Sequence, residues 1–264
     1  ASASPSDWFS WPGLPSQISQ MFSGRVTAET LLCPDASLQC PGAASKFASM
    51  RFLVFPLLLV TCVVAQPPAP APGTSGFGKP AIISTEELAG FGELPADRRK
   101  LIEAAIAVAK NSPWLPYTVE GGDPAQGGFD CSGAMYFVMR QCKLDPPRSS
   151  AGQLKWLKEN SRLHEVPADA EKLDHPSMKL LRPGDLLFWG KPDGVGGALR
   201  INHVAMYLGT EKKDGLAVMI NSTDGRSYRG VKANGYGVYD FRLPKAGGTT
   251  VFIGYGTPPG VEDG

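Results

Sequence analysis

The feature that most constrains the fold is a change of hydrophobic pattern near residue 180. Before it, apolar residues recur at helical spacing over residues 97–111, 131–142 and 150–158. After it, short apolar runs alternate with turns rich in Gly, Pro and Asp; these runs are residues 186–189, 201–208, 216–221, 237–241 and 250–255. Helices followed by a meander of strands predict an α+β domain, with N-terminal helices packed on an antiparallel sheet of five to six strands.

Composition excludes several classes of function. The 264 residues carry a net charge of only +1, so nothing favours binding to nucleic acid or to an anionic membrane. The five cysteines form neither a CxxC pair nor a dense disulfide framework, and the chain has only three histidines. A structural zinc site is therefore not predicted. We expect a monomer that needs no metal or other cofactor.

The first part of the chain resembles a targeting region. Residues 1–49 are rich in Ser, Pro and Ala, and we expect them to be disordered sequence upstream of a true start at Met50, translated by mistake. Residues 50–65 have a basic start, an apolar run and a small last residue, which predicts a signal peptide cleaved after Ala65. The predicted location is therefore outside the cytoplasm, in the periplasm, the cell envelope or the medium.

Two alternatives remain for this region. Residues 52–65 could be an internal membrane anchor, although the run is short for a spanning helix. Lipid attachment at Cys62 is less favoured, because the preceding Thr61 is not the small residue that such sites prefer. Residues 66–95 are rich in Pro, Ala and Gly and predict a linker, followed by a folded domain over residues 96–258.

Cys131 is the candidate nucleophile. The sequence Phe129-Asp130-Cys131-Ser132-Gly133 runs directly into an apolar helix, so the cysteine lies in the first helical turn. A helix N-terminus stabilises negative charge, which predicts a lowered pKa for this thiol. The alternative is a small buried cysteine at the start of a core helix.

His203 and Asn221 are the candidate base and its orienting partner. His203 lies in an alternating strand, whereas His164 and His175 lie in polar sequence and are expected at the surface in loops. Asn221 ends the next apolar run, so on an adjacent antiparallel strand it could hydrogen-bond to the imidazole of His203. The alternative, equally weighted from the residues alone, is that Asn221 merely begins the Ser222-Thr223-Asp224-Gly225 turn.

Three sequence blocks together resemble the NlpC-type cysteine peptidases. They are Phe129-Asp130-Cys131-Ser132-Gly133, residues 182–189 (RPGDLLFW) and residues 202–209 (NHVAMYLG). The resemblance covers about residues 98–257 and implies a papain-like core. Such enzymes cleave peptidoglycan stem peptides, typically between D-γ-glutamate and a diamino acid. It makes Cys131 the nucleophile, His203 the base and Asn221 the third residue, where the family most often has histidine.

The same resemblance implies a substrate-binding role for Tyr117, Asp130 and Ser132. In the family, these positions shape the site for the N-terminal end of the stem peptide, and a tyrosine hydroxyl beside an aspartate suits a free ammonium group. Helix capping by Asp130 and a filler role for Ser132 are the alternatives.

The predicted function is a secreted cysteine endopeptidase, and the expected partner is the peptidoglycan stem peptide. In its mechanism, backbone N–H groups at the start of the Cys131 helix are expected to stabilise the oxyanion. Two alternatives keep the same fold: a non-catalytic wall-binding relative, and an amidase or acyltransferase with another amide substrate.

Overall fold

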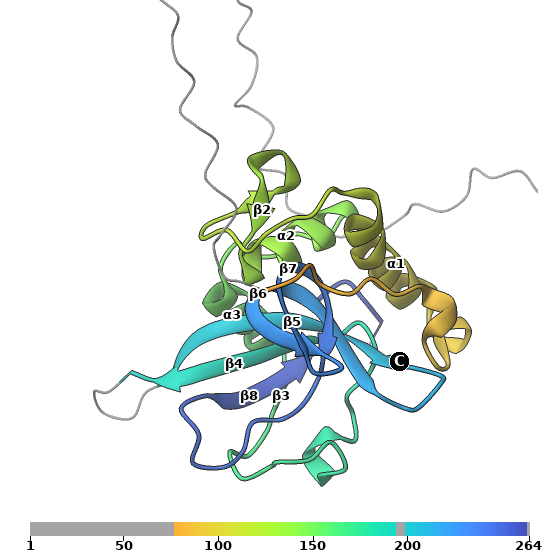
Figure 1. Ribbon diagram of the computed structural model, residues 1–264. Helices are drawn as coiled ribbons and strands as arrows, with labels where there is room; N and C mark the ends of the chain where they lie inside the picture. The colour runs from red at the N-terminus through yellow and green to blue at the C-terminus, as the bar shows by residue number, and fades with distance from the viewer. Residues whose placement is uncertain (1–76, 194–198, 263–264) are drawn as a thin grey trace, which may run out of the picture. The chain divides into compact units, whose positions relative to one another are not determined.

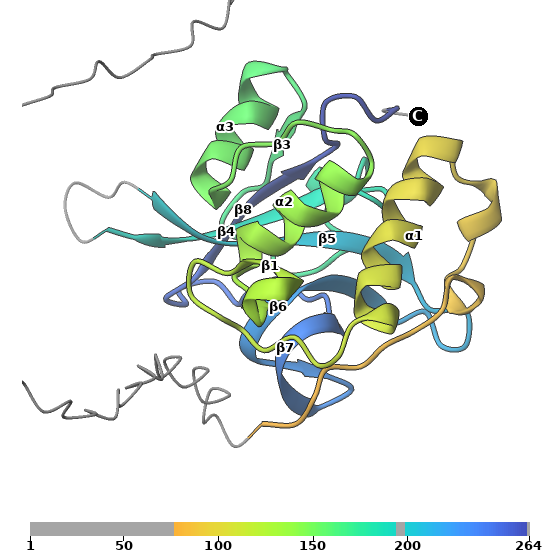
Figure 2. The same ribbon diagram turned by 90° about the horizontal axis from the view of Figure 1, so that it is seen from above.

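Three α-helices lie on one face of an antiparallel sheet in the computed structural model, which describes residues 77–193 and 199–262 (Figures 1 and 2). The helices are α1 (Ala96–Asn111), α2 (Cys131–Gln141) and α3 (Ser150–Glu159). The predicted α+β class is confirmed. Within the described residues, no helix is both long and apolar enough to cross a membrane. The predicted signal peptide lies outside the described residues.

The main sheet has six strands in the order β3-β8-β4-β5-β6-β7, and every neighbouring pair is antiparallel. Its strands are β3 (Leu163–Glu165), β4 (Leu186–Pro192), β5 (Leu199–Thr210), β6 (Ala217–Tyr228), β7 (Val231–Asp240) and β8 (Val251–Gly256). A separate two-stranded ribbon, β1 (Gly122–Asp123) with β2 (Gly128–Phe129), leads directly into α2. The ribbon therefore positions the first turn of the helix that begins at Cys131.

Both faces of the sheet are apolar, because side chains alternate along each strand. On one face, α2 packs over β5 and β6, and Met135, Val138 and Met139 of this helix are fully buried (Figure 2). The opposite face holds a second cluster, which includes Trp189, Tyr239, Phe241, Phe252 and Tyr255. The segment between β3 and β4 packs against this second cluster and contains the 3-10 turn η4 (Pro176–Met178).

Strand β6 is longer than predicted. The expected turn at residues 222–225 is instead part of the strand, which continues to Tyr228 in register with β7. A β-bulge between Asp224 and Arg226 interrupts the register, and Gly225 adopts a φ of 89°, a conformation that favours glycine. Asn221 therefore lies inside a strand and does not begin a turn.

His164 also differs from its expected position. It lies in β3, opposite Tyr255 of β8, and the two ring centroids are 5.2 Å apart. Its polar sequence context predicted a surface loop, but a three-residue edge strand is too short to show a periodic signal.

The packed region begins before residue 96, where the sequence predicted the end of a linker. Residues 78, 81 and 88 form isolated bridges to Ala233, Val238 and Glu211, and Ile83 and Leu88 are buried in the core on the helix-covered face. Two 3-10 turns, η1 (Thr85–Glu87) and η2 (Phe91–Glu93), lead the chain into α1. A few apolar residues among Gly and Pro thus suffice to attach this segment.

One buried ion pair ties α1 to the start of β4. Arg98 and Asp185 are each 1% exposed, and Arg98 Nη1 lies 2.9 Å from Asp185 Oδ1. The same guanidinium donates to Thr257 Oγ1 at 2.6 Å and to the Pro183 carbonyl at 2.8 Å, and Thr257 donates to Asp185 Oδ1 at 2.8 Å. This network fixes the turn before β4.

Candidate active site

Cys131 is the first residue of α2, as predicted. The carboxylate of Asp130 caps the helix by accepting the Gly133 N–H at 2.6 Å. Ser222 of β6 donates its hydroxyl to the Phe129 carbonyl at 2.7 Å, which ties the approach to the sheet. A Cβ at Gly133 would lie 2.7 Å from Arg148 Nη2 and would overlap the Gly121 carbonyl. Glycine therefore allows the helix to pack this closely against the ribbon.

Asp130 is engaged on both of its oxygen atoms. Arg148 Nη2 donates to Oδ2 at 2.9 Å, and Arg148 Nη1 donates to Oδ1 at 3.1 Å. Ser132 Oγ also donates to Oδ1 at 3.1 Å, and Arg148 Nη2 reaches the carbonyls of Glu120 and Gly121. The capping role of Asp130 is thus present. A substrate ammonium bound here would share the carboxylate with Arg148, and that role stays a prediction.

His203 and Asn221 lie side by side on β5 and β6. The Asn221 amide nitrogen is 2.5 Å from His203 Nε2, while Asn221 Oδ1 is buried without a hydrogen-bond partner. The two ends of an amide have the same shape, so the oxygen can occupy the position facing the ring. In that orientation Asn221 accepts the Nε2–H of His203. The other ring nitrogen, Nδ1, is then left with its lone pair free to act as a base.

The sulfur of Cys131 lies against the strand that carries His203. The backbone N–H of Val204, the residue after His203, lies near enough to this sulfur to favour the thiolate and so lower its pKa, as do the N–H groups of Cys131 and Ser132. Helix α2 packs across β5 and β6, so these contacts follow from the core described above. The fold thus gathers the predicted nucleophile and the strand of its predicted base into one region.

The predicted lowering of the pKa of Cys131 is wrong. Burial raises the pKa of the thiol above its usual value, and the charge of Asp130 raises it further, which together outweigh the N–H donors. For His203, burial is the larger cause and the charge of Arg226 the smaller one, and both hold its pKa well below the usual value near 6.5. A neutral thiol and a neutral imidazole are therefore favoured near pH 7, so proton transfer would accompany attack.

Tyr117 lies near Cys131 and Asp130. Its backbone N–H donates to Asn234 Oδ1 at 3.0 Å, and the residue bridges Phe129 at the end of β2. Burial raises the pKa of its phenol, and the charges of Cys131 and Asp130 raise it further. Tyr117 thus lies within electrostatic range of both residues, as its predicted role requires.

Two side chains beside the site were not identified from the sequence. The ring of Trp189 lies 5.4 Å from the ring of His203, centroid to centroid, and Arg226 lies over the same indole. From the sequence, Trp189 was identified as a residue of a buried strand and as the end of the block at residues 182–189, but no role in the site was assigned to it. Arg226 gave no signal, because it follows a predicted turn that is in fact a bulged strand.

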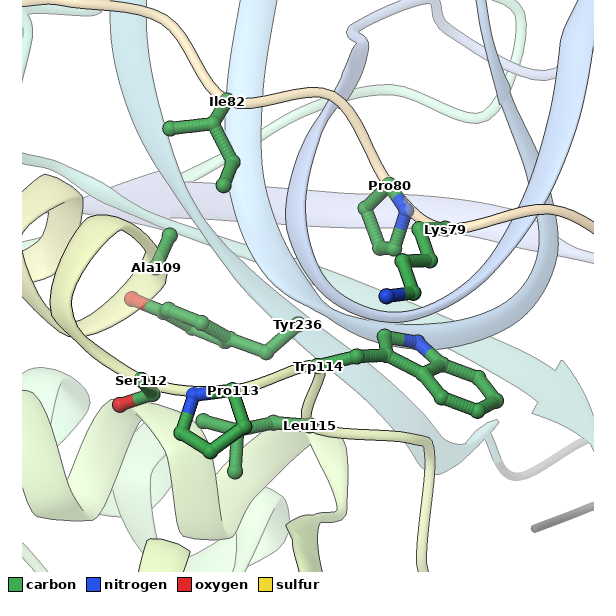
Figure 3. A pocket seen from close by; sticks show the side chains of 9 residues that line it. All are labelled: Lys79, Pro80, Ile82, Ala109, Ser112, Pro113, Trp114, Leu115 and Tyr236. Carbon is green, nitrogen blue, oxygen red and sulfur yellow. The ribbon is translucent and has the colours of Figure 1, made fainter.

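A separate cavity of about 310 Å³ lies between residues 79–82, the end of α1 and β7 (Figure 3). Ile82, Trp114 and Tyr236 line it, with Lys79 at its edge, and none of its lining residues is a predicted site residue (Figure 3). The described residues contain no group of three or more His, Cys, Asp or Glu side chains that could hold a metal ion.

Comparison with known proteins shows a similarity within the folded domain. Residues 115–238 match the model of the NlpC/P60 family. No curated protein matches the chain.

Several solved structures are similar. The peptidoglycan hydrolase RipB from Mycobacterium tuberculosis is 25% identical, with 62% of this chain and 69% of that chain covered and a TM-score of 0.36. The P60 domain of an antigen from M. avium subspecies paratuberculosis is 25% identical, with 61% and 97% covered and a TM-score of 0.34. A lipoprotein-like NLP/P60 protein from Staphylococcus aureus is 20% identical, with a TM-score of 0.32; the match covers 60% of this chain and only 38% of that chain. The family match lies within the folded domain and runs from the segment before the β1–β2 ribbon into β7.

Proposed function

We propose that this protein is an exported cysteine endopeptidase that hydrolyses amide bonds in peptidoglycan stem peptides, at the bond between D-γ-glutamate and a diamino acid. The observation that carries the proposal is the pairing of His203 with Asn221, whose amide nitrogen lies 2.5 Å from His203 Nε2. The pair lies on the sheet against which the Cys131 sulfur packs. The NlpC/P60 family match supports the reaction class. The sequence pattern of residues 50–65 supports export.

In the proposed mechanism, His203 accepts the thiol proton as the sulfur attacks the substrate carbonyl. Since burial favours the neutral thiol and the neutral ring, transfer and attack are coupled and no ion pair forms beforehand. Asn221 holds the imidazole in orientation but carries no charge. Backbone N–H groups at the start of α2 are the natural donors to the oxyanion. The amine leaves with the proton from His203, and water activated by His203 then releases the acyl group.

The test is digestion of defined muropeptides by the purified protein, with products weighed by mass spectrometry. We expect one cut between D-glutamate and the diamino acid, abolished in Cys131→Ala and His203→Ala. Cys142→Ala is the matched control, because Cys142 is the other free cysteine among the described residues and lies past the end of α2. It should retain full activity.

Three results would overturn the proposal. Hydrolysis that survives in Cys131→Ala removes the nucleophile. A product from a different amide, or an acyl group transferred to an added amine, would indicate an amidase or an acyltransferase of the same fold. Binding of cell wall without any cleavage would indicate a non-catalytic relative.

A further inference from the structure

Arg226 lies in the candidate site with an unusual environment for a guanidinium. Its Cζ is 4.5 Å from the ring centroid of Trp189, a residue that is 1% exposed, and the same indole lies 5.4 Å from the His203 ring. Trp189 thus contacts both the candidate base and this cation. The charge of Arg226 also acts on His203, and the charge of the Cys131 thiolate acts on Arg226.

The second observation is that Arg226 has no anionic partner. Within residues 77–193 and 199–262, no hydrogen bond or ion pair engages its guanidinium. Other arginines in these ranges pair with carboxylates: Arg98 with Asp185, Arg140 with Asp145, Arg148 with Asp130, Arg229 with Glu211 and Asp214, and Arg242 with Asp240.

The environment of Arg226 is therefore costly for a cation. Removal from water lowers its pKa to about 10, and its neighbours supply no fixed negative charge in return. The nearest acidic residue in sequence, Asp224, is exposed and accepts a hydrogen bond from Asn234 instead. Five N–H donors on one rigid plane thus remain available beside the candidate catalytic pair.

We propose that Arg226 is a specificity-determining residue that binds a carboxylate of the substrate next to the scissile amide. This inference rests on the proposed function. A guanidinium binds a carboxylate through two parallel hydrogen bonds, and the contact with the Trp189 indole restricts where this guanidinium can lie. A γ-linked glutamate leaves its α-carboxylate free, separated from the scissile carbonyl by the three carbon atoms Cα, Cβ and Cγ. The diamino acid can supply a second carboxylate from the leaving side.

Three peptides separate these sources. The parent carries a free glutamate α-carboxylate and a diamino acid with a carboxylated side chain. The second has the α-carboxylate converted to the amide, and the third has lysine as the diamino acid. For the wild type, we expect kcat/KM to fall by about tenfold or more for the peptide that lacks the recognised carboxylate. The peptide with the lower kcat/KM identifies which of the two carboxylates Arg226 binds.

The variants then assign the preference to Arg226. In Arg226→Gln, kcat/KM for the parent peptide should fall to the value for the peptide that lacks the recognised carboxylate. The two peptides should then be cleaved equally well. Arg226→Lys should restore part of it, because an ammonium keeps the charge but loses the fork. The matched control is Arg242→Gln, which removes the same charge from a side chain that is 72% exposed. It should keep the wild-type preference. If Arg226 only supported the Trp189 ring, Arg226→Gln would lower kcat/KM equally for all three peptides. That result overturns the inference.

A binding measurement keeps the inference separate from the proposed function. The Cys131→Ala protein is titrated calorimetrically with each peptide, with and without Arg226→Gln. We expect the peptide with the recognised carboxylate to bind about tenfold or more tightly than its counterpart, only where Arg226 is present. Equal binding of all three peptides, or no binding of any, overturns the inference. Selective binding without hydrolysis by the wild type would instead overturn the endopeptidase and leave Arg226 as a carboxylate-binding residue.

Discussion

Replacing Arg98 with methionine tests how much the domain depends on its buried ion pair. The substitution keeps much of the apolar stem but leaves Asp185, which is 1% exposed, without its cation. Removing one partner of a buried pair costs about 3–5 kcal/mol. For a domain of this size each kcal/mol shifts Tm by about 2–4 °C, so we expect Tm to fall by about 6–20 °C. Thermal unfolding followed by circular dichroism measures this loss.

The pH dependence of the loss identifies its cause. Burial already raises the pKa of Asp185, and Arg98 opposes that rise, so the variant should have a still higher pKa at this carboxyl. The folded variant then binds a proton that the unfolded chain releases, so its stability increases as pH falls. The gap between wild type and Arg98→Met should therefore be larger at pH 7 than at pH 5.

Two variants complete the test. Arg99→Met is the matched control, because Arg99 lies nearer the surface and makes one exposed contact, to the Gly92 carbonyl. It should change Tm little. Adding Asp185→Asn to Arg98→Met removes the unpaired charge and should recover part of the loss. If Arg98→Met costs less than about 1 kcal/mol, or no more than Arg99→Met, the ion pair does not hold α1 to the start of β4.

Three further predictions concern the site. Asn221→Ala should lower kcat by about 10²-fold with little change in KM, because the His203 ring loses its orienting contact. Asn221→His should retain more activity. Steady-state kinetics measure both variants, and a change in KM alone would contradict the prediction. The acidic limb of the kcat/KM profile against pH should have its midpoint below about 6.5, since the lowered pKa keeps His203 neutral at lower pH. Arg226→Gln should move this midpoint upward. A midpoint above 6.5 in the wild type would refute the assignment of His203 as the base. Gly133→Ala should lower the free energy of unfolding in urea by about 1–3 kcal/mol and reduce activity, because the new Cβ would overlap Arg148 and the Gly121 carbonyl. Gly92→Ala is the control and should change neither, because a Cβ there has no atom within 4 Å.

The elements that could be predicted from sequence are those whose signals are local. The helix beginning at Cys131 follows from an Asp cap and an apolar period, and the α+β class follows from the order of the patterns. The pairing of Asn221 with His203 needed one assumption, that consecutive strands are antiparallel neighbours, and β5 and β6 are.

The features that could not be predicted depend on burial and on distant contacts. The direction of the pKa of Cys131 depends on how deeply α2 sits on the sheet, which the helix-terminus argument alone does not include. Residues 78–88 resemble a linker in composition, but they attach to the fold through bridges to strands more than a hundred residues away. Arg226 lies beyond a Ser-Thr-Asp-Gly sequence that resembles a turn, so its approach to Trp189 became visible only in three dimensions.

The bulge at Gly225 decides which face of β6 Arg226 occupies. In an uninterrupted strand, residues 221 and 226 are separated by an odd number of steps and would project to opposite sides. The extra residue pairs Arg226 with Ala233, a member of the cluster that contains Trp189, and so returns it to the side of Asn221. In a related strand without the bulge, an arginine five residues after the asparagine would instead project toward the helices. Alignments of this strand should therefore be anchored on the glycine, and the spacing from the asparagine alone would misassign the cation.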